Sequence, residues 1–93
     1  MYAVFVEVSA DESHTEEARK SLNETAVPMA KEHGGKTGFW LAPEGGRGLS
    51  VVVFDSEGDA RRAAEPLHVG EPAGGVPGVT FKTVEVREVL ASF

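Results

Sequence analysis

The sequence contains no cysteine. Without thiols the chain can form no disulfide, thiolate zinc site or iron–sulfur cluster, and it offers no cysteine nucleophile. Basic residues are also scarce: nine Lys and Arg stand against 15 Asp and Glu, which gives a net charge of −6. No run of basic residues is longer than Arg61–Arg62. Because binding to nucleic acid needs clustered cations that displace the counterions of phosphates, no nucleic-acid partner is expected.

Long apolar stretches are absent as well. No apolar run approaches the ~20 residues that a membrane helix needs, so no membrane association is expected. The first residues lack the basic region of a signal peptide, which indicates a soluble cytoplasmic protein. The 93 residues, of which 41% are hydrophobic, suit one globular domain over residues 1–93 with a single core.

The first third of the chain predicts a strand and then a helix. Apolar and β-branched residues alternate over residues 2–9, which is typical of a strand. Ser13 and Glu16 have the spacing of a capping box, and apolar residues then recur at helical spacing. Pro28 lies inside this helix, and because it has no amide hydrogen it predicts a kink or break near Ala26–Val27.

The middle of the chain predicts a hairpin and a second helix. Lys36–Ala42 and Leu49–Phe54 are rich in β-branched and aromatic residues and flank a turn over Pro43–Gly48. The glycines of this turn join two strands rather than a strand and a helix, so they do not form a phosphate-binding loop. Ser56 then caps a helix with an alanine-rich face, which becomes irregular at Pro66.

The end of the chain predicts a loop and a last strand. Val69–Gly78 contains four glycines and two prolines, which predicts a mobile segment that could act as a lid. The last strand is expected over Val79–Ala91. Its apolar residues change parity between Phe81 and Val84, and two explanations stay open: a bulge near Lys82–Thr83, or two faces that meet different partners.

The order of these elements predicts an α+β, ferredoxin-like βαββαβ fold, with a four-stranded antiparallel sheet and two helices on one face. Val51–Phe54 is apolar at both parities, so the face without helices would carry a large apolar patch. A second copy, paired by a two-fold axis, is the simplest cover for such a patch. The sequence therefore predicts a homodimer through the sheet face.

Five segments carry a family resemblance: Tyr2–Val8, the helix with Val27-Pro28, Gly34–Leu41, Val53–Glu57 and the ending Val84–Phe93. They are similar to dimeric α+β barrel proteins of the antibiotic-biosynthesis-monooxygenase-like group, in particular to small bacterial members. The resemblance implies a homodimer whose sheets face each other, with a pocket between sheet and helices in each subunit. Some members oxidise polycyclic phenols with molecular oxygen and no cofactor, and others degrade haem.

The resemblance thus implies a small-molecule-binding protein. If it is an enzyme, the resemblance implies a cofactor-independent monooxygenase that acts on an aromatic or polyketide-like substrate. Haem-degrading members have an Asn on the first strand, whereas this chain has Glu7 there and its one Asn, Asn23, in the predicted helix. His68 matches a haem-ligating His by position alone, so no cofactor is expected. A binding module without chemistry and a self-association domain are the alternatives.

Three side chains are candidates for the base that an oxygenase needs to remove a phenolic proton: His33, Glu7 and His68, in that order. His33 leads because the ordinary pKa of histidine, ~6.5, lies near working pH. A structural role is open for each, since a His in a last helical turn also suits the helix dipole. No two His have the i, i+4 spacing of a helical metal site, so no metal is expected.

Two aromatic residues are candidates for contact with a small aromatic ligand. Trp40 can form the wall of a pocket on its strand, or it can belong to the core or the dimer interface. Phe54 ends the third strand, at a position where members of the resembling group often have Trp. A pocket with Trp40 and one His or Glu would favour an enzyme, and a pocket without them would favour a binding module.

Overall fold

A computed structural model describes residues 1–73, 76 and 78–93 of the chain. Its elements are β1 (Tyr2–Ser9), a 3-10 turn (Glu12–His14), α1 (Thr15–Ser21), a π-helical turn (Leu22–Ala26), α2 (Val27–Glu32), β2 (Gly35–Glu44), β3 (Arg47–Phe54), α3 (Glu57–Ala64) and β4 (Thr80–Glu88). This order confirms the predicted α+β class with a βαββαβ-like succession of elements.

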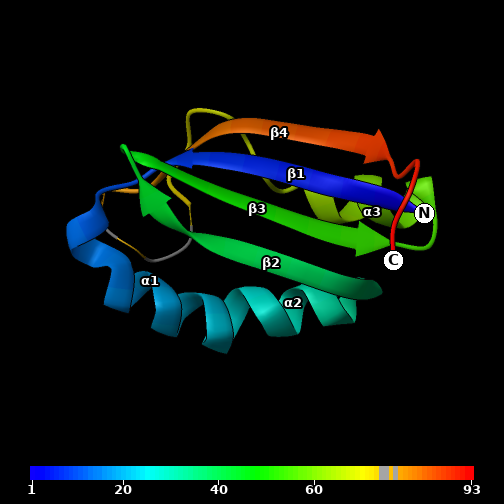
Figure 1. Cartoon of the computed structure of the whole chain (residues 1–93), viewed down its shortest axis with the longest axis horizontal. Helices are drawn as coiled ribbons and strands as arrows, with labels where there is room; N and C mark the ends of the chain where they lie inside the picture. Colours follow the sequence, from blue (N-terminus) through cyan, green and yellow to red (C-terminus); the bar gives the residue numbers. More distant parts are fainter. Residues whose placement is uncertain (74–75, 77) are drawn as a thin grey trace.

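The four strands form one antiparallel sheet in the order β2-β3-β1-β4. This order is consistent with a ferredoxin-like topology. Figure 1 shows α1 and α2 running along the edge strand β2, whereas α3 lies behind the sheet. None of the helices in the described part of the chain is long and apolar enough to cross a membrane.

The core lies on the face of the sheet that the helices contact. Val4 pairs with Val52 across the two central strands, and both are buried. Phe54, at the end of β3, is only 1% exposed, and Ala60 of α3 is completely buried against the same cluster. From α2, Ala30 packs against this cluster, so both helical segments contribute to one core.

None of the helices in the described residues covers the opposite face of the sheet, which is apolar at its centre. We call it the open face, and its apolar members are the odd-numbered residues Ala3, Phe5, Phe39, Leu41, Leu49, Val51 and Val53. Phe39 is 64% exposed and Leu41 is 59% exposed. The two parities of β3 are therefore used differently: Val52 is in the core and Val53 is on the open face.

The predicted capping box at the first helix is wrong. Asp11, not Ser13, is the cap: its carboxylate accepts the Ser13 amide hydrogen at 2.8 Å and begins a 3-10 turn. A carboxylate two residues ahead of an amide closes such a turn readily. Ser13 thus lies inside the turn, and α1 begins at Thr15 after His14, which makes no side-chain cap.

Pro28 disturbs the first helix as predicted, and the disturbance lies in the helical turn that precedes the proline. Leu22–Ala26 is π-helical, and the Val27 amide donates to the carbonyl of Leu22. Pro28 offers no hydrogen to the carbonyl four residues back, and its ring crowds that carbonyl, so widening the preceding turn relieves both problems. The side chain of Asn23 donates to the Arg19 carbonyl at 2.8 Å, which adds a hydrogen bond within the same region.

The last strand contains the predicted bulge. Glu7 of β1 lies opposite Thr83, and Val8 lies opposite Phe81, so Lys82 is the extra residue. The bulge places Phe81, Val84 and Val86 together in contact with the core in spite of their different parity. The strand is shorter than predicted and ends at Glu88 rather than at Ala91.

Other boundaries differ by a few residues. The hairpin turn is Gly45-Gly46 instead of Pro43–Gly48, because both strands extend further; β2 is an edge strand, where proline is tolerated. The Ser56 hydroxyl accepts the Asp59 amide at 3.1 Å, which confirms the cap of α3.

The segment predicted to be a mobile lid pairs in part with the last strand. Gly70 donates to the Phe81 carbonyl at 2.8 Å, and Phe81 donates to Glu71 at 3.0 Å. Pro72 forms an isolated bridge with Thr80. Residues 74, 75 and 77 of the segment lie outside the described residues, and its role as a lid stays a prediction.

A close approach between α2 and the sheet depends on Gly35. A Cβ atom at this position would lie 2.8 Å from the carbonyl oxygen of Ala30 and 3.3 Å from a methyl group of Val52. The first of these atoms belongs to the backbone, so it cannot move without the helix. Glycine therefore sets how near α2 lies to β2 and β3.

We expect Gly35→Ala to lower the free energy of unfolding by ~1–3 kcal/mol, the usual range for overpacking. Urea titration followed by circular dichroism measures this change. Gly58→Ala is the matched control: a Cβ there would make only ordinary contacts, with the flexible end of Arg62 at 3.5 Å and the Ser56 hydroxyl oxygen at 4.0 Å, so helical Ala should leave stability equal or higher. Wild-type stability in Gly35→Ala would contradict this account of the helix–sheet contact.

Candidate functional site

A cavity of about 170 Å3 lies between α2 and the sheet, beside Trp40. Its lining comes from α2, β2 and β3, and most of its members are apolar or glycine, with two lysines and a threonine. The lining residues are Val27, Ala30, Lys31, Gly35, Lys36, Thr37, Gly38, Trp40 and Val52. The cavity exists because α2 contacts β2 through small residues. It is the candidate binding site of the chain.

Glycine shapes the floor of this cavity next to the indole. A Cβ at Gly38 would lie 3.0 Å from a Val52 methyl group and 3.5 Å from Cζ3 of Trp40. The indole therefore lies over the bare backbone of Gly38, on the strand that it belongs to. Trp40 packs against the core on its other side, so the ring is supported from below and borders free space.

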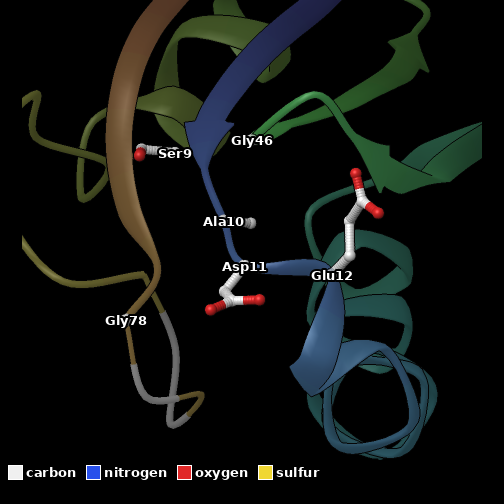
Figure 2. Close-up of a pocket in the computed structure, with 6 residues that line it drawn as sticks. All are labelled: Ser9, Ala10, Asp11, Glu12, Gly46 and Gly78. Carbon is white, nitrogen blue, oxygen red and sulfur yellow. The ribbon is translucent and has the colours of Figure 1, made fainter.

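A second, wider hollow of about 460 Å3 lies where β1 ends, and Figure 2 shows its lining. Ser9, Ala10, Asp11 and Glu12 line it together with Gly78 and with Gly46, whose carbonyl accepts the Ala10 amide at 3.0 Å. Glu12 rises toward the β2–β3 hairpin in Figure 2, where its carboxylate accepts the Gly45 amide at 2.9 Å. The carboxylates of Asp11 and Glu12 both accept hydrogen bonds from backbone amides. These two residues of the hollow therefore stabilise the local fold.

The environment of Asp11 favours its charged form. The backbone amide and the side chain of Ser13 donate to the carboxylate and lower the pKa of Asp11 below its ordinary value of 3.8. His14 adds a smaller lowering, and burial acts weakly in the opposite direction. The cause is hydrogen bonding to the ionised form, which is the role of a cap rather than of an acid or base.

The structure separates the two aromatic candidates. Trp40 lines the cavity, whereas Phe54 is 1% exposed and lies in the core. Phe54 pairs across the sheet with Tyr2 of β1 and with Gly35 of β2. The sequence signal was the same for both residues, an aromatic on a strand, and only the packing of α2 and α3 distinguishes them.

Glu7 lies on the open face, opposite to the cavity. Its side chain is 16% exposed, and its Oε2 accepts a hydrogen bond from Nε of Arg47 at 2.9 Å. The pair joins neighbouring strands, because β1 and β3 are antiparallel and Arg47 begins β3. The carboxylate thus has a partner at the margin of the apolar patch.

The two remaining candidate bases are exposed and lie at the ends of helices. His33 follows α2, and its amide donates to the carbonyl of Met29 at 3.1 Å. His68 lies beyond α3, where its carbonyl accepts the Glu71 amide at 3.1 Å. Neither lines the cavity, and no group of three His, Asp or Glu that could hold a metal ion occurs among the residues described.

Sequence reasoning missed the polar members of the cavity. Lys31 lies between the apolar positions of the predicted helix and Lys36 begins a predicted strand, and neither pattern indicates a ligand site. The signal that could have found them is the segment Gly34-Gly35, because a short helix–strand connection brings the last helical turn next to the first strand residues. Lys36 also pairs with Asp55, with 3.1 Å between Nζ and Oδ2.

Comparison of the chain with protein-family models, with curated proteins and with solved structures gives no significant match. The fold is that of a small α+β domain with a four-stranded antiparallel sheet and two helices. The family resemblance of the sequence is used below as part of a proposal.

The lowered pKa of Asp11 predicts a contribution to stability that depends on pH. A carboxyl whose pKa is lower in the folded state stabilises the fold above its unfolded pKa of ~3.9, and this contribution is lost as pH falls through the folded value. We expect the stability difference between wild type and Asp11→Asn to shrink as the pH is lowered below ~4. Urea titrations between pH 7 and pH 2.5 measure it, with Glu24→Gln as an exposed control. A difference that stays constant over this range would contradict the assignment.

Proposed function

We propose that the protein is a small-molecule-binding homodimer related to the dimeric α+β barrel proteins, and that its ligand is a small aromatic molecule. The observation that carries this proposal is the cavity between α2 and the sheet, with Trp40 at its border. An indole beside an apolar space offers stacking or edge contacts to an aromatic ring. Clefts of this type, lined by apolar residues with a few polar groups, are the usual form of ligand sites.

The helix above the cavity supports the same proposal. Val27 and Ala30, which line the cavity, follow directly on the π-helical turn Leu22–Ala26. Such turns are found frequently at functional sites, because the extra residue redirects the helical side chains that follow it. No residue of α1, the π-helical turn or α2 is fully buried, so the segment can adjust to a ligand at little cost in packing.

The open face supports the homodimer. Its centre is apolar, with Phe39 and Leu41 more than half exposed. Its margins carry charges of both signs, in the pairs Glu7–Arg47 and Glu85–Arg87. A second copy rotated by a two-fold axis presents the same apolar centre and the same mixed margins, so this face is complementary to itself. Soluble monomers rarely leave such a patch uncovered.

Binding without chemistry is the function that this lining supports best, because neither a His nor a carboxylate lines the cavity in the part of the chain that is described. Oxygenation of a bound phenol is the second candidate. The observation in its favour is the position of His33, between two stretches of chain that line the cavity. Glu7 would face the partner subunit, and His68 lies beyond α3.

The homodimer predicts a mass of about twice 9.9 kDa in sedimentation experiments at micromolar concentration. Phe39→Asp should give a folded monomer, since the ring is 64% exposed in the single chain and a charge at the dimer centre is costly. Val52→Asp should instead unfold the chain, because Val52 is in the core. Met29→Asp, on an exposed apolar residue of α2, is the control and should leave the dimer intact.

A wild-type protein that is strictly monomeric at these concentrations would contradict the proposed homodimer. So would a Phe39→Asp variant that keeps the doubled mass.

Ligand binding predicts a rise in the melting temperature with small aromatic compounds, because a ligand stabilises the folded state that it binds. Ala30→Leu should abolish the rise, since the larger side chain fills the cavity that Ala30 lines. Ala18→Leu lengthens a half-buried side chain of α1 outside the cavity and is the matched control.

A screen of phenols, quinones, aromatic acids and haem by thermal shift makes this measurement. Shifts that persist in Ala30→Leu would exclude the cavity as the site. Consumption of a phenol in air that is lost in His33→Ala would establish the oxygenase in place of the binding module.

A further inference from the structure

We infer that the ligand of the Trp40 cavity is an aromatic acid with a single ring, whose carboxylate lies beside Lys31. This inference rests on the proposed function, since it names the chemical class of the ligand in the same cavity. It is carried by two properties of the lining, the size of the free space and the sign of its charge.

The size limits the ligand to one ring. The cavity measures about 170 Å3. An apolar cavity of roughly 150 Å3 is enough to hold benzene. The space beside Trp40 therefore matches one six-membered ring with a small substituent, and the fused rings of a polycyclic phenol would extend beyond its lining into solvent. Gly35 and Gly38 carry no side chains, so no smaller residue at these two positions could enlarge the cavity.

The charge of the lining selects an anion. Lys31 and Lys36 are its two ionisable members, and no Asp or Glu is among the lining residues that the structure describes. This is a local exception in a chain with a net charge of −6. An acidic protein repels anions in general, so a cavity bordered by two ammonium groups, of which only that of Lys36 has an acidic partner among the described residues, has a distinct preference.

The two lysines differ in their availability. Nζ of Lys36 lies 3.1 Å from Oδ2 of Asp55, which neutralises it and ties the start of β2 to the end of β3. Lys31 takes part in none of the ion pairs found among the described residues. Its position on the last turn of α2 lets the flexible side chain reach an anionic group at the cavity mouth.

A carboxylate fits this arrangement better than a phenol. The phenolic pKa is ~10, so a phenol is neutral at pH 7, whereas a carboxyl group with a pKa of ~4 is ionised. An ionised group gains a charge-assisted hydrogen bond from the ammonium group of Lys31.

The test compares benzoate with benzamide, which have the same shape and differ in charge. The chain has one tryptophan, so its single indole N–H signal in a proton–nitrogen correlation spectrum reports the cavity without ambiguity. We expect wild type to bind benzoate about tenfold more tightly than benzamide, the usual worth of one charged hydrogen bond. Lys31→Gln should reduce this preference to nearly equal affinities.

Lys20→Gln is the matched control, because it removes the same charge from an exposed position of α1 outside the cavity. It should keep the preference for benzoate. Added salt should reduce that preference in wild type and not in Lys31→Gln, since exposed charges are screened. Circular dichroism confirms that each variant is folded.

The outcomes separate this inference from the proposed function. Equal affinities for benzoate and benzamide in wild type would overturn the aromatic acid and leave the aromatic-binding cavity standing. A preference that survives in Lys31→Gln would overturn the role of Lys31. If neither compound shifts the indole signal, while a larger phenol does, the limit to a single ring is wrong; if no aromatic compound shifts it, the proposed function falls as well.

Discussion

The pairing of β1 with β3 decides the side of the sheet on which each apolar residue lies. Because strand side chains alternate, Val4 and Val52 point to the helices while Phe5 and Val51 point away from them. Both sets are apolar, and the chain has helices for only one of them. The core, the open face and the cavity of α2 all follow from this register, since a shift by one residue would exchange the two faces.

Much of the fold was predictable because its signals are local. The alternation of β1, the cap at Ser56 and the bulge at Lys82 each depend on a few neighbouring residues. The errors came where two local signals compete. Ser13 and Asp11 can both cap a helix, and in the structure the Asp11 carboxylate accepts the Ser13 amide, which places Ser13 inside a 3-10 turn. Strand ends such as Glu88 depend on partners distant in the sequence, which periodicity does not report.

The candidate site was harder to predict than the fold. An aromatic residue on a strand can belong to the core or form a pocket wall, and Trp40 packs against the core while it also borders the cavity. Phe54 has the same sequence signal but lies under α3 in the core. The candidate bases were chosen for their chemistry alone, and the sheet parity that puts Glu7 opposite the cavity was not used in choosing them. Lys31 escaped notice because its neighbours across the cavity belong to another element.

The strand β2 connects the two faces on which the proposals rest. Its residues alternate between them, with Trp40 toward the cavity and Phe39 and Leu41 toward the open face. As an edge strand, β2 is held by β3 on one side only, so its backbone is less restrained than that of β1. In the proposed homodimer, a partner subunit on Phe39 and Leu41 would remove part of this freedom and with it part of the freedom of the indole. Because ordering the site in advance lowers the entropic cost of binding, the proposed dimerisation and ligand binding would favour each other through this strand.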